Sequence, residues 1–268
     1  MHESLSPTNE CSVSIITVCF NGVPDQIRYT IDSVLNQRNV SREIILIDGG
    51  SDELTMNCLN SYSEKFSFFV SERDSGIYDA MNKGLAHAGG EWVVFMNIGD
   101  RFHSNQTLSG MLRPENLVGD PWMIYGDTLM RDPARPWWVA RVPERISRFF
   151  LFGGMVCHQS MLVKRSAFEK IGVFNTAYRL LCDKDWLFRF LEAGLASRHC
   201  QMTVCDWDVR GASSNLEAFN RERSVLRNGK YSKFERALYP GMWTGIKILE
   251  RLRSATFQPA RVDRIGEH

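Results

Sequence analysis

The sequence has no excess of charge of either sign and no long hydrophobic run. Its 268 residues carry a formal net charge of +1 at pH 7, which gives no general attraction to nucleic acid or to anionic lipid. No apolar run approaches the roughly 20 residues that a membrane-spanning helix needs. Residues 1–10 are polar and lack the apolar segment of a secretory signal. These absences predict a cytoplasmic protein.

The seven cysteines are scattered and form no CxxC pair. An odd number at irregular spacing predicts no disulfide framework, so a reducing compartment fits best. His199, Cys200 and Cys205 lie close in sequence, but their spacing is poor for a zinc site. Buried free thiols are the favoured interpretation.

Two glycine-rich loops that hold phosphates are also missing. The first predicted strand is followed by no GxGxxG, which argues against an NAD-dependent enzyme. Residues 17–22 supply no loop that could cradle a triphosphate, which counts against a sugar nucleotidyltransferase. That enzyme class is kept as a low-ranking alternative.

What the sequence does contain is the composition and pattern of an α/β protein. A hydrophobic fraction of 44% and a charged fraction of 24% suit a globule with a large core. Short β-branched runs alternate with helical periodicity up to residue 100, which predicts βαβ units and an open, mostly parallel, Rossmann-like sheet flanked by helices. The predicted strands are 13–20, 43–47, 66–71, 92–96, 122–127, 136–140 and 158–164, and the predicted helices are 25–37, a segment ending near 62, 77–88, 183–193 and a tail from 216 to 253 broken at Pro240-Gly241.

No linker divides the chain. We expect a domain at 1–215, with a nucleotide half at about 11–101 and an acceptor half at about 102–215. A helical C-terminal extension at 216–268 would pack on this domain or on a membrane surface.

Polar side chains follow several of the predicted strands, where ligands bind in open α/β sheets. Asp48 directly follows a strand and precedes two glycines, which allow the backbone to approach a ligand closely. A tight turn with an aspartate cap is the alternative interpretation. Thr17 and Asn21, at the end of the first strand, would lie beside the same pocket.

The segment Asp74-Ser-Gly-Ile-Tyr-Asp79-Ala-Met-Asn82-Lys83-Gly84 is much richer than a helix start requires. Asp74 or Ser75 could simply cap the helix that begins near Ile77. Asn97-Ile-Gly-Asp100 then ends the fourth strand and supplies oxygen ligands of the kind that Mg²⁺ or Mn²⁺ prefers. An aspartate at a strand-end turn is the alternative for Asp100.

Together these motifs resemble the family 2 glycosyltransferases with the GT-A fold, and in particular bacterial surface-polysaccharide enzymes of the colanic acid and exopolysaccharide type. The resemblance covers roughly the first two hundred residues and is densest from Val13 to Asp100 and around His158 and Asp183. It implies transfer of a sugar from a nucleotide-sugar to a saccharide or polyprenyl-linked acceptor, with inversion, in bacterial polysaccharide biosynthesis.

The resemblance also implies roles for single residues on the donor side. Asp48 would bind the nucleotide base, with Thr17 and Asn21 beside it. Asp100 would be the principal carboxylate for Mg²⁺ or Mn²⁺, although Asn97 and Gly99 stand where the family has acidic residues. The remaining donor-site residues implied are Asp74, Asp79, Asn82, Lys83 and Asn97, while Tyr78 and Met81 are expected to pack in the core.

On the acceptor side, the resemblance implies that Asp183 is the general base and Asp185 its neighbour. Carboxylates in a first helical turn are also favoured by the helix dipole, which is the alternative for both. His158 and Gln159 match a His-Gln pair of the family at the acceptor side, whereas a satisfied core histidine is the commoner case.

Two further alternatives concern the activity of the chain and the position of its C-terminal tail. The departures at Asn97 and Gly99 leave open a catalytically degenerate sugar-nucleotide-binding module. In the tail, a basic amphipathic stretch either packs on the domain or makes peripheral contact with the cytoplasmic face of the inner membrane. Its residues are Trp243, Ile246, Lys247, Ile248, Leu249, Arg251 and Arg253.

Overall fold

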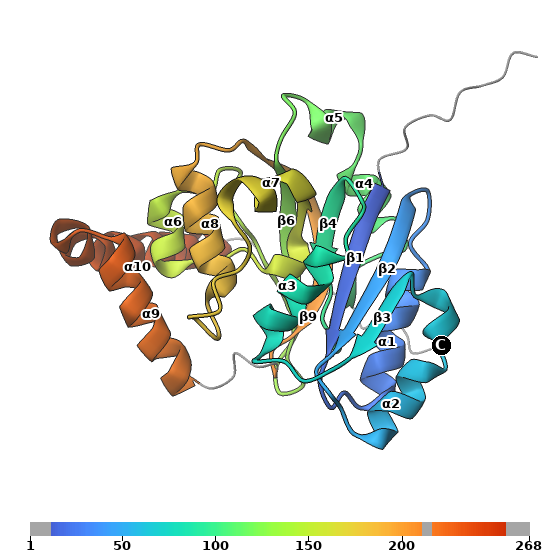
Figure 1. Cartoon of the computed structure of the whole chain (residues 1–268). Helices are drawn as coiled ribbons and strands as arrows, with labels where there is room; N and C mark the ends of the chain where they lie inside the picture. Colours follow the sequence, from blue (N-terminus) through green and yellow to red (C-terminus); the bar gives the residue numbers. More distant parts are fainter. Residues whose placement is uncertain (1–11, 211–215, 256–268) are drawn as a thin grey trace, which may run out of the picture.

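The computed structural model describes residues 12–210 and 216–255 (Figure 1). Its strands are β1 (Ser12–Cys19), β2 (Ser41–Asp48), β3 (Phe68–Ser71), β4 (Trp92–Phe95), β5 (Arg101–Phe102), β6 (Met123–Arg131), β7 (Trp138–Ala140), β8 (Met161–Lys164) and β9 (Ser197–Asp208). Its α-helices are α1 (Pro24–Leu35), α2 (Glu53–Asn60), α3 (Ile77–Ala86), α4 (Thr107–Met111), α5 (Pro114–Leu117), α6 (Arg148–Gly153), α7 (Arg165–Ile171), α8 (Cys182–Glu192), α9 (Leu216–Lys230) and α10 (Lys233–Ala255). Two 3₁₀ turns, η1 (Ser63–Lys65) and η2 (His158–Ser160), complete the described elements.

All of these strands belong to one sheet, with the order β3-β2-β1-β4-β8-β6-β9-β5 and β7 paired to β6. The first four strands in this order run parallel, as the alternating pattern predicts. β8 then pairs antiparallel with both β4 and β6, while β6 and β9 are parallel. The carboxyl ends of β1, β2, β3 and β4 therefore meet at one edge of the sheet, where the predicted ligand residues lie.

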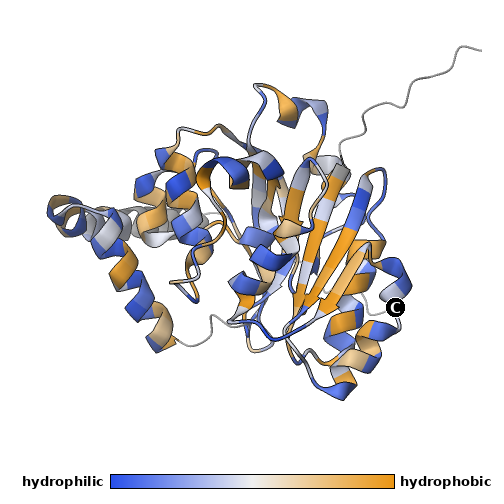
Figure 2. Cartoon of the chain, in the orientation of Figure 1, coloured by the Kyte–Doolittle hydropathy of each residue, from blue (hydrophilic) through white to orange (hydrophobic). Residues whose placement is uncertain are grey.

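The strands at the centre of the sheet are buried on both faces. In β1, Ile15 packs with Val34 of α1, while its neighbour Ile16 packs with Met81 of α3 on the opposite face. Successive side chains of a strand point to opposite faces, so a strand covered by helices on both sides is an unbroken apolar run. Figure 2 shows these central strands as the most hydrophobic ribbons of the molecule.

Two expectations about secondary structure are wrong, and one strand was not expected. Residues 158–160 form the 3₁₀ turn η2, and only Met161–Lys164 are strand. The helix α10 continues through Pro240 instead of breaking there. The twelve-residue strand β9 was not predicted, because its burial is irregular along its length.

The helices α9 and α10 lie beside α6 and α8, away from β1–β3 (Figure 1). The Tyr231 hydroxyl donates to the carbonyl of Arg148 at 2.7 Å, and the Trp243 ring lies against Gly153. Trp243 therefore packs on the domain, whereas the side chains of residues 246–253 lie outside the described part. Within the described residues, no helix is both long and apolar enough to cross a membrane.

Candidate active site

The Asp48 carboxylate lies at the end of β2 and shapes the loop that follows. The backbone N–H groups of Gly50 and Ser51 donate to its Oδ2 at 3.1 and 2.9 Å. The hydroxyls of Ser51 and Ser71 donate to the same carboxylate at 2.5 and 2.6 Å. The turn interpretation of Asp48 is therefore realised in the structure, and recognition of a base by Asp48 stays a prediction.

The end of β1 joins this loop. Asn21 has a left-handed backbone with φ of 48°, and its Oδ1 accepts the N–H of Asp52 at 3.1 Å. The Asn21 N–H donates to the hydroxyl of Ser51 at 2.7 Å. Nearby in β1, the Thr17 hydroxyl is buried and has no hydrogen-bond partner among the described residues. The structure thus brings Asn21 together with the Asp48 loop, as the sequence predicts.

The segment before α3 lies against the same loop. Asp74 Oδ1 accepts the N–H of Gly76 at 2.9 Å, while a Cβ placed on Gly49 would lie 2.5 Å from Asp74 Oδ2. Gly49 is therefore required by the close approach of the Asp74 carboxylate. Asp79 accepts the N–H of Ser75 at 2.9 Å and keeps a partly exposed side chain. This end of α3 places Asp74 and Asp79 beside the loop of Asp48.

Asn82 and Lys83 face other parts of the protein. Asn82 Nδ2 donates to the carbonyl of Phe174 at 2.9 Å, and its Oδ1 accepts the Phe174 N–H at 3.0 Å. Lys83 Nζ donates to the carbonyl of Arg73 at 3.0 Å and pairs with Glu72 at 2.8 Å. Asn82 thus ties α3 to the loop before α8, while contact of Lys83 with a diphosphate stays a prediction.

A buried hydrogen-bonded chain links the end of β4 to the start of α8. Asn97 Nδ2 lies 2.9 Å from His158 Nε2, and His158 Nδ1 lies 3.1 Å from Asp183 Oδ2. All three side chains are at most a tenth exposed. The Tyr78 ring, in the first turn of α3, approaches the His158 ring edge-on, with 6.0 Å between the ring centres. Tyr78 is buried, as expected. The chain Asn97–His158–Asp183 is called the relay below.

Asp100 lies beside this relay and is also buried. Gln159 Nε2 donates to its Oδ2 at 2.7 Å, and the N–H of Asp208 donates to its Oδ1 at 2.9 Å. Burial raises the pKa of Asp100 to about 6, although these hydrogen bonds and the nearby charge of Arg131 oppose the rise. A buried carboxylate with a raised pKa is a site where a cation would be favourable.

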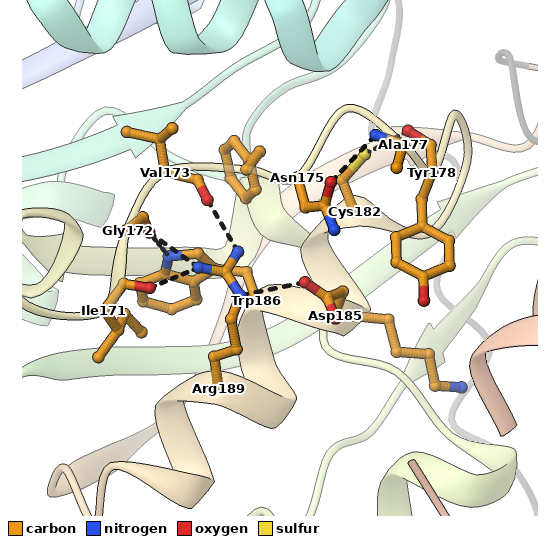
Figure 3. Close-up of polar contacts among 12 residues, drawn as sticks. Ile171, Gly172, Val173, Asn175, Ala177, Tyr178, Cys182, Asp185, Trp186 and Arg189 are labelled. Atoms are coloured by element: carbon orange, nitrogen blue, oxygen red, sulfur yellow. Dashed lines mark hydrogen bonds and ion pairs between the residues drawn. The ribbon is translucent and has the colours of Figure 1, made fainter. Parts of the chain in front are cut away.

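Asp185 is engaged in a different network, shown in Figure 3. Its Oδ2 accepts from Arg189 Nε at 3.0 Å, and its Oδ1 lies 3.3 Å from Lys230 Nζ. Arg189 in turn donates to the carbonyls of Ile171, at 2.5 Å, and Val173, at 2.8 Å. Asp185 therefore fastens α8 to the loop after α7 and to α9, and nothing in this geometry brings it to the relay.

Two residues near the site, Asp206 and Arg131, carried no signal in the sequence pattern. Asp206 of β9 is fully buried and pairs with Arg101 Nε and His103 Nδ1, each at 2.7 Å. Arg131 donates to the carbonyl of Gly99 at 2.7 Å and lies over the Tyr29 ring. Each of these contacts depends on β9 or on the end of β6, so only the tertiary structure reveals them.

Glu222 of α9 holds the segment directly before α8. Its carboxylate accepts the backbone N–H groups of Arg179, Leu180 and Leu181 at 2.7, 2.8 and 3.1 Å. The helix α9 therefore helps to position the start of α8, and with it Asp183.

The described side chains offer few ligands to a metal ion. In residues 12–210 and 216–255, no group of three or more His, Cys, Asp or Glu side chains could hold a metal ion by itself, and the described cysteines are free. Asn97 Oδ1 is buried without a hydrogen-bond partner among the described residues, and binding of a cation by Asp100 stays a prediction.

Comparisons with known proteins agree on the class. The model of the family described as Glycosyl transferase family 2 matches residues 14–172. A Mycobacterium tuberculosis protein described as a PGL/p-HBAD biosynthesis glycosyltransferase is 31% identical over 192 residues, which cover 69% of this chain and 72% of that protein. An uncharacterized glycosyltransferase of Mycobacterium tuberculosis is 31% identical over 216 residues, 78% of this chain and 80% of that protein.

Solved structures share the fold. The mannosyltransferase PcManGT of Pyrobaculum calidifontis, in complex with GDP-Man and Mn²⁺, superposes with a TM-score of 0.59 at 20% identity, over 84% of this chain and 64% of that one. S. aureus TarS 1-349 gives a TM-score of 0.57 at 14% identity, over 84% of this chain and 77% of that one. From the family match, the relatives and the GT-A fold, we conclude that the chain belongs to glycosyl transferase family 2 and is a glycosyltransferase.

Proposed function

We propose that the protein transfers a sugar from a nucleotide-sugar to an acceptor hydroxyl with inversion, and that Asp183 is the general base. The observation that carries this proposal is the buried relay beside the carboxyl ends of β1, β2 and β4. A buried carboxylate held by a histidine and next to a ligand edge is the arrangement expected of a functional acid–base group.

The hydrogen bonds of the relay have one consistent direction when Asp183 acts as the base. An ionised Asp183 can only accept, so His158 donates from Nδ1; its Nε2 then accepts from the amide of Asn97. The remaining oxygen, Asp183 Oδ1, accepts the N–H of Lys184 at 2.8 Å. The acceptor hydroxyl would transfer its proton to Asp183 as it attacks the anomeric carbon, and the nucleoside diphosphate would leave on the opposite side.

The donor would occupy the edge formed by the Asp48 loop, Asn21 and the turn of Asp74 and Asp79. A divalent cation held by Asp100 and Asn97 Oδ1 would neutralise charge on the departing diphosphate. The titles of two fold neighbours name a nucleotide-sugar: GDP-Man in PcManGT and UDP-GlcNAc in TarS 1-349. These titles support the donor class without selecting the nucleotide.

The acceptor would be a saccharide, free or lipid-linked, in bacterial polysaccharide biosynthesis. The relatives named for PGL/p-HBAD biosynthesis support a biosynthetic role.

On α10, Phe234, Leu238 and Met242 follow one another at intervals of four residues and are exposed by 73%, 44% and 46%. Since basic residues such as Lys233 flank this stripe, we propose that it rests on an anionic lipid surface. Replacing Phe234 and Leu238 by serine would then abolish flotation with anionic vesicles; unchanged flotation would refute the contact.

The test begins with a thermal-shift screen of UDP-, GDP-, dTDP- and CMP-sugars, with and without Mn²⁺. A ligand that binds only the folded state raises its stability by mass action. The donor found in this way is then used with free and lipid-linked acceptors, and NMR reports the anomeric configuration of the product. Retention of configuration would contradict the proposed mechanism.

Asp183→Asn should lower kcat by about a hundred- to ten-thousand-fold while leaving donor binding intact. Asp25→Asn, which removes a fully exposed carboxylate of α1, is the matched control and should be neutral. If wild type and Asp183→Asn show equal turnover, Asp183 is not the base. Donor binding with no transfer or hydrolysis would favour the degenerate binding module, and formation of a nucleotide-sugar from a sugar phosphate would favour the nucleotidyltransferase.

A further inference from the structure

A cavity lies between α9, α10 and α6, outside the relay and the donor edge. It has a volume of about 270 Å³ and is lined by the three guanidinium groups of Arg223, Arg227 and Arg236. The other lining residues are Phe152, Asn220, Ser224, Asn228 and Pro240. No carboxylate lines it, so its walls combine positive charge with neutral polar groups.

The three arginines lack counter-charges. Among the described residues, no carboxylate oxygen lies within 4.0 Å of any of their nitrogens. Arg223 donates to the Asn220 side chain at 2.7 Å, and Arg236 donates to the Asn228 side chain. Each guanidinium carries five N–H donors, so most of these donors are left for another partner.

Arg227, which lines this cavity, is held by Phe152. Its Nε donates to the carbonyl of Phe152 at 3.1 Å, and its guanidinium lies 3.9 Å from the centre of the Phe152 ring. Burial, followed by the like charge of Arg223, lowers its pKa. Two neighbouring guanidiniums that repel each other at the same cavity are stabilised when an anion binds between them.

We propose that this cavity is a binding site for a phosphoryl group, either a phosphomonoester or a diphosphate. Paired guanidiniums match the geometry of phosphate oxygens, and the neutral amides and the Ser224 hydroxyl can bond the remaining oxygens. The same helix carries Glu222, which holds the segment before Asp183. A phosphoryl group bound here therefore lies on the helix that positions the candidate base.

The phosphoryl group could belong to a soluble compound or to the head group of a lipid-linked acceptor. The assignment to an acceptor rests on the proposed function, whereas binding of the anion does not. The site can therefore be tested in the full-length protein without any turnover.

The primary measurement is calorimetric titration with inorganic diphosphate. The variant Arg223→Gln/Arg236→Gln keeps Arg227 and its structural contacts. Its affinity for diphosphate should fall by about a hundredfold, because two charge-assisted interactions are lost. The matched control Arg221→Gln/Lys65→Gln removes the same charge from exposed positions outside the cavity and should bind like wild type.

Two results would overturn the site: equal loss of affinity in both double variants, or no loss in either. Phosphatidylcholine vesicles with or without phosphatidic acid then identify the source. The ligand is a lipid head group if wild type floats only with vesicles that contain phosphatidic acid, and if Arg223→Gln/Arg236→Gln loses this flotation while the control variant keeps it. Diphosphate binding without such flotation supports a soluble phosphate ligand. Thermal shift with the donor nucleotide-sugar should be unchanged in both variants, which separates failure of this site from failure of the proposed function.

Discussion

Lys184 is a buried cation next to the candidate base, and its removal should stabilise the protein at neutral pH. Its side chain is only 5% exposed, and no carboxylate oxygen of the described residues lies within 4.0 Å of its Nζ. Burial, together with the charge of Arg227, lowers its pKa from 10.5 to about 8, although Asp183 opposes the change. We expect Lys184→Met, which keeps an unbranched chain of similar shape, to relieve this cost.

The sign follows from linkage. A lysine whose pKa is depressed in the folded state contributes stability above its unfolded pKa, and this contribution is lost as the pH falls through the folded pKa. The difference between about 8 and 10.5 corresponds to at most about 3 kcal/mol in the free energy of unfolding. Lys184→Met should therefore be more stable than wild type by up to about 3 kcal/mol near pH 7, with the gain shrinking toward pH 10.5.

The assay is urea unfolding of both proteins across this pH range. Lys65→Met, at an exposed position of η1, is the control and should show no such pH-dependent difference. A constant difference between Lys184→Met and wild type at every pH would show that packing, not charge, decides the effect. Destabilisation by Lys184→Met near pH 7 would refute the reasoning altogether.

Three further changes test the relay and the packing beneath it. His158→Gln should lower kcat by about a hundredfold with little change in donor KM, because Asp183 loses its positioning donor; a change confined to KM would contradict this. Asn97→Asp should lower kcat, because a carboxylate has no N–H to donate to His158 Nε2; an unchanged kcat would speak against it. Gly84→Ala should cost about 1–3 kcal/mol in urea unfolding, because the new Cβ would lie 2.4 Å from Ile16 Cγ2; unchanged stability would show that α3 can shift.

The first half of the fold was predictable because its strands obey local rules. The strands β1, β2 and β4 contain continuous buried apolar runs, as expected of parallel strands covered on both faces. The strand β9 breaks these rules. Its pairing with β6 is irregular near Asp127, its Gln201 has a φ of 52°, and its exposed and buried residues do not alternate. Such a strand is specified by its neighbours rather than by its own sequence.

The candidate site was predictable as a set of residues, but their individual contacts were not. Asp183 and Asp185 look equivalent in the first turn of α8. Residues two apart on a helix point in different directions, so one meets His158 and the other meets Arg189 and Lys230. Likewise, the bond between Asp100 and the N–H of Asp208 joins positions 108 residues apart, which no local pattern contains.

Asn97, which first looked like a loss from the metal motif, has a chemical reason within the relay. A neutral histidine has one N–H, and in His158 the ionised Asp183 claims it at Nδ1. His158 Nε2 must then accept, and an amide can donate where a carboxylate cannot. An aspartate at position 97 has no N–H to donate, so this hydrogen bond to His158 Nε2 would be lost. Asparagine therefore completes the relay and leaves Asp100 as the carboxylate available to a cation, so the departure fits an active enzyme.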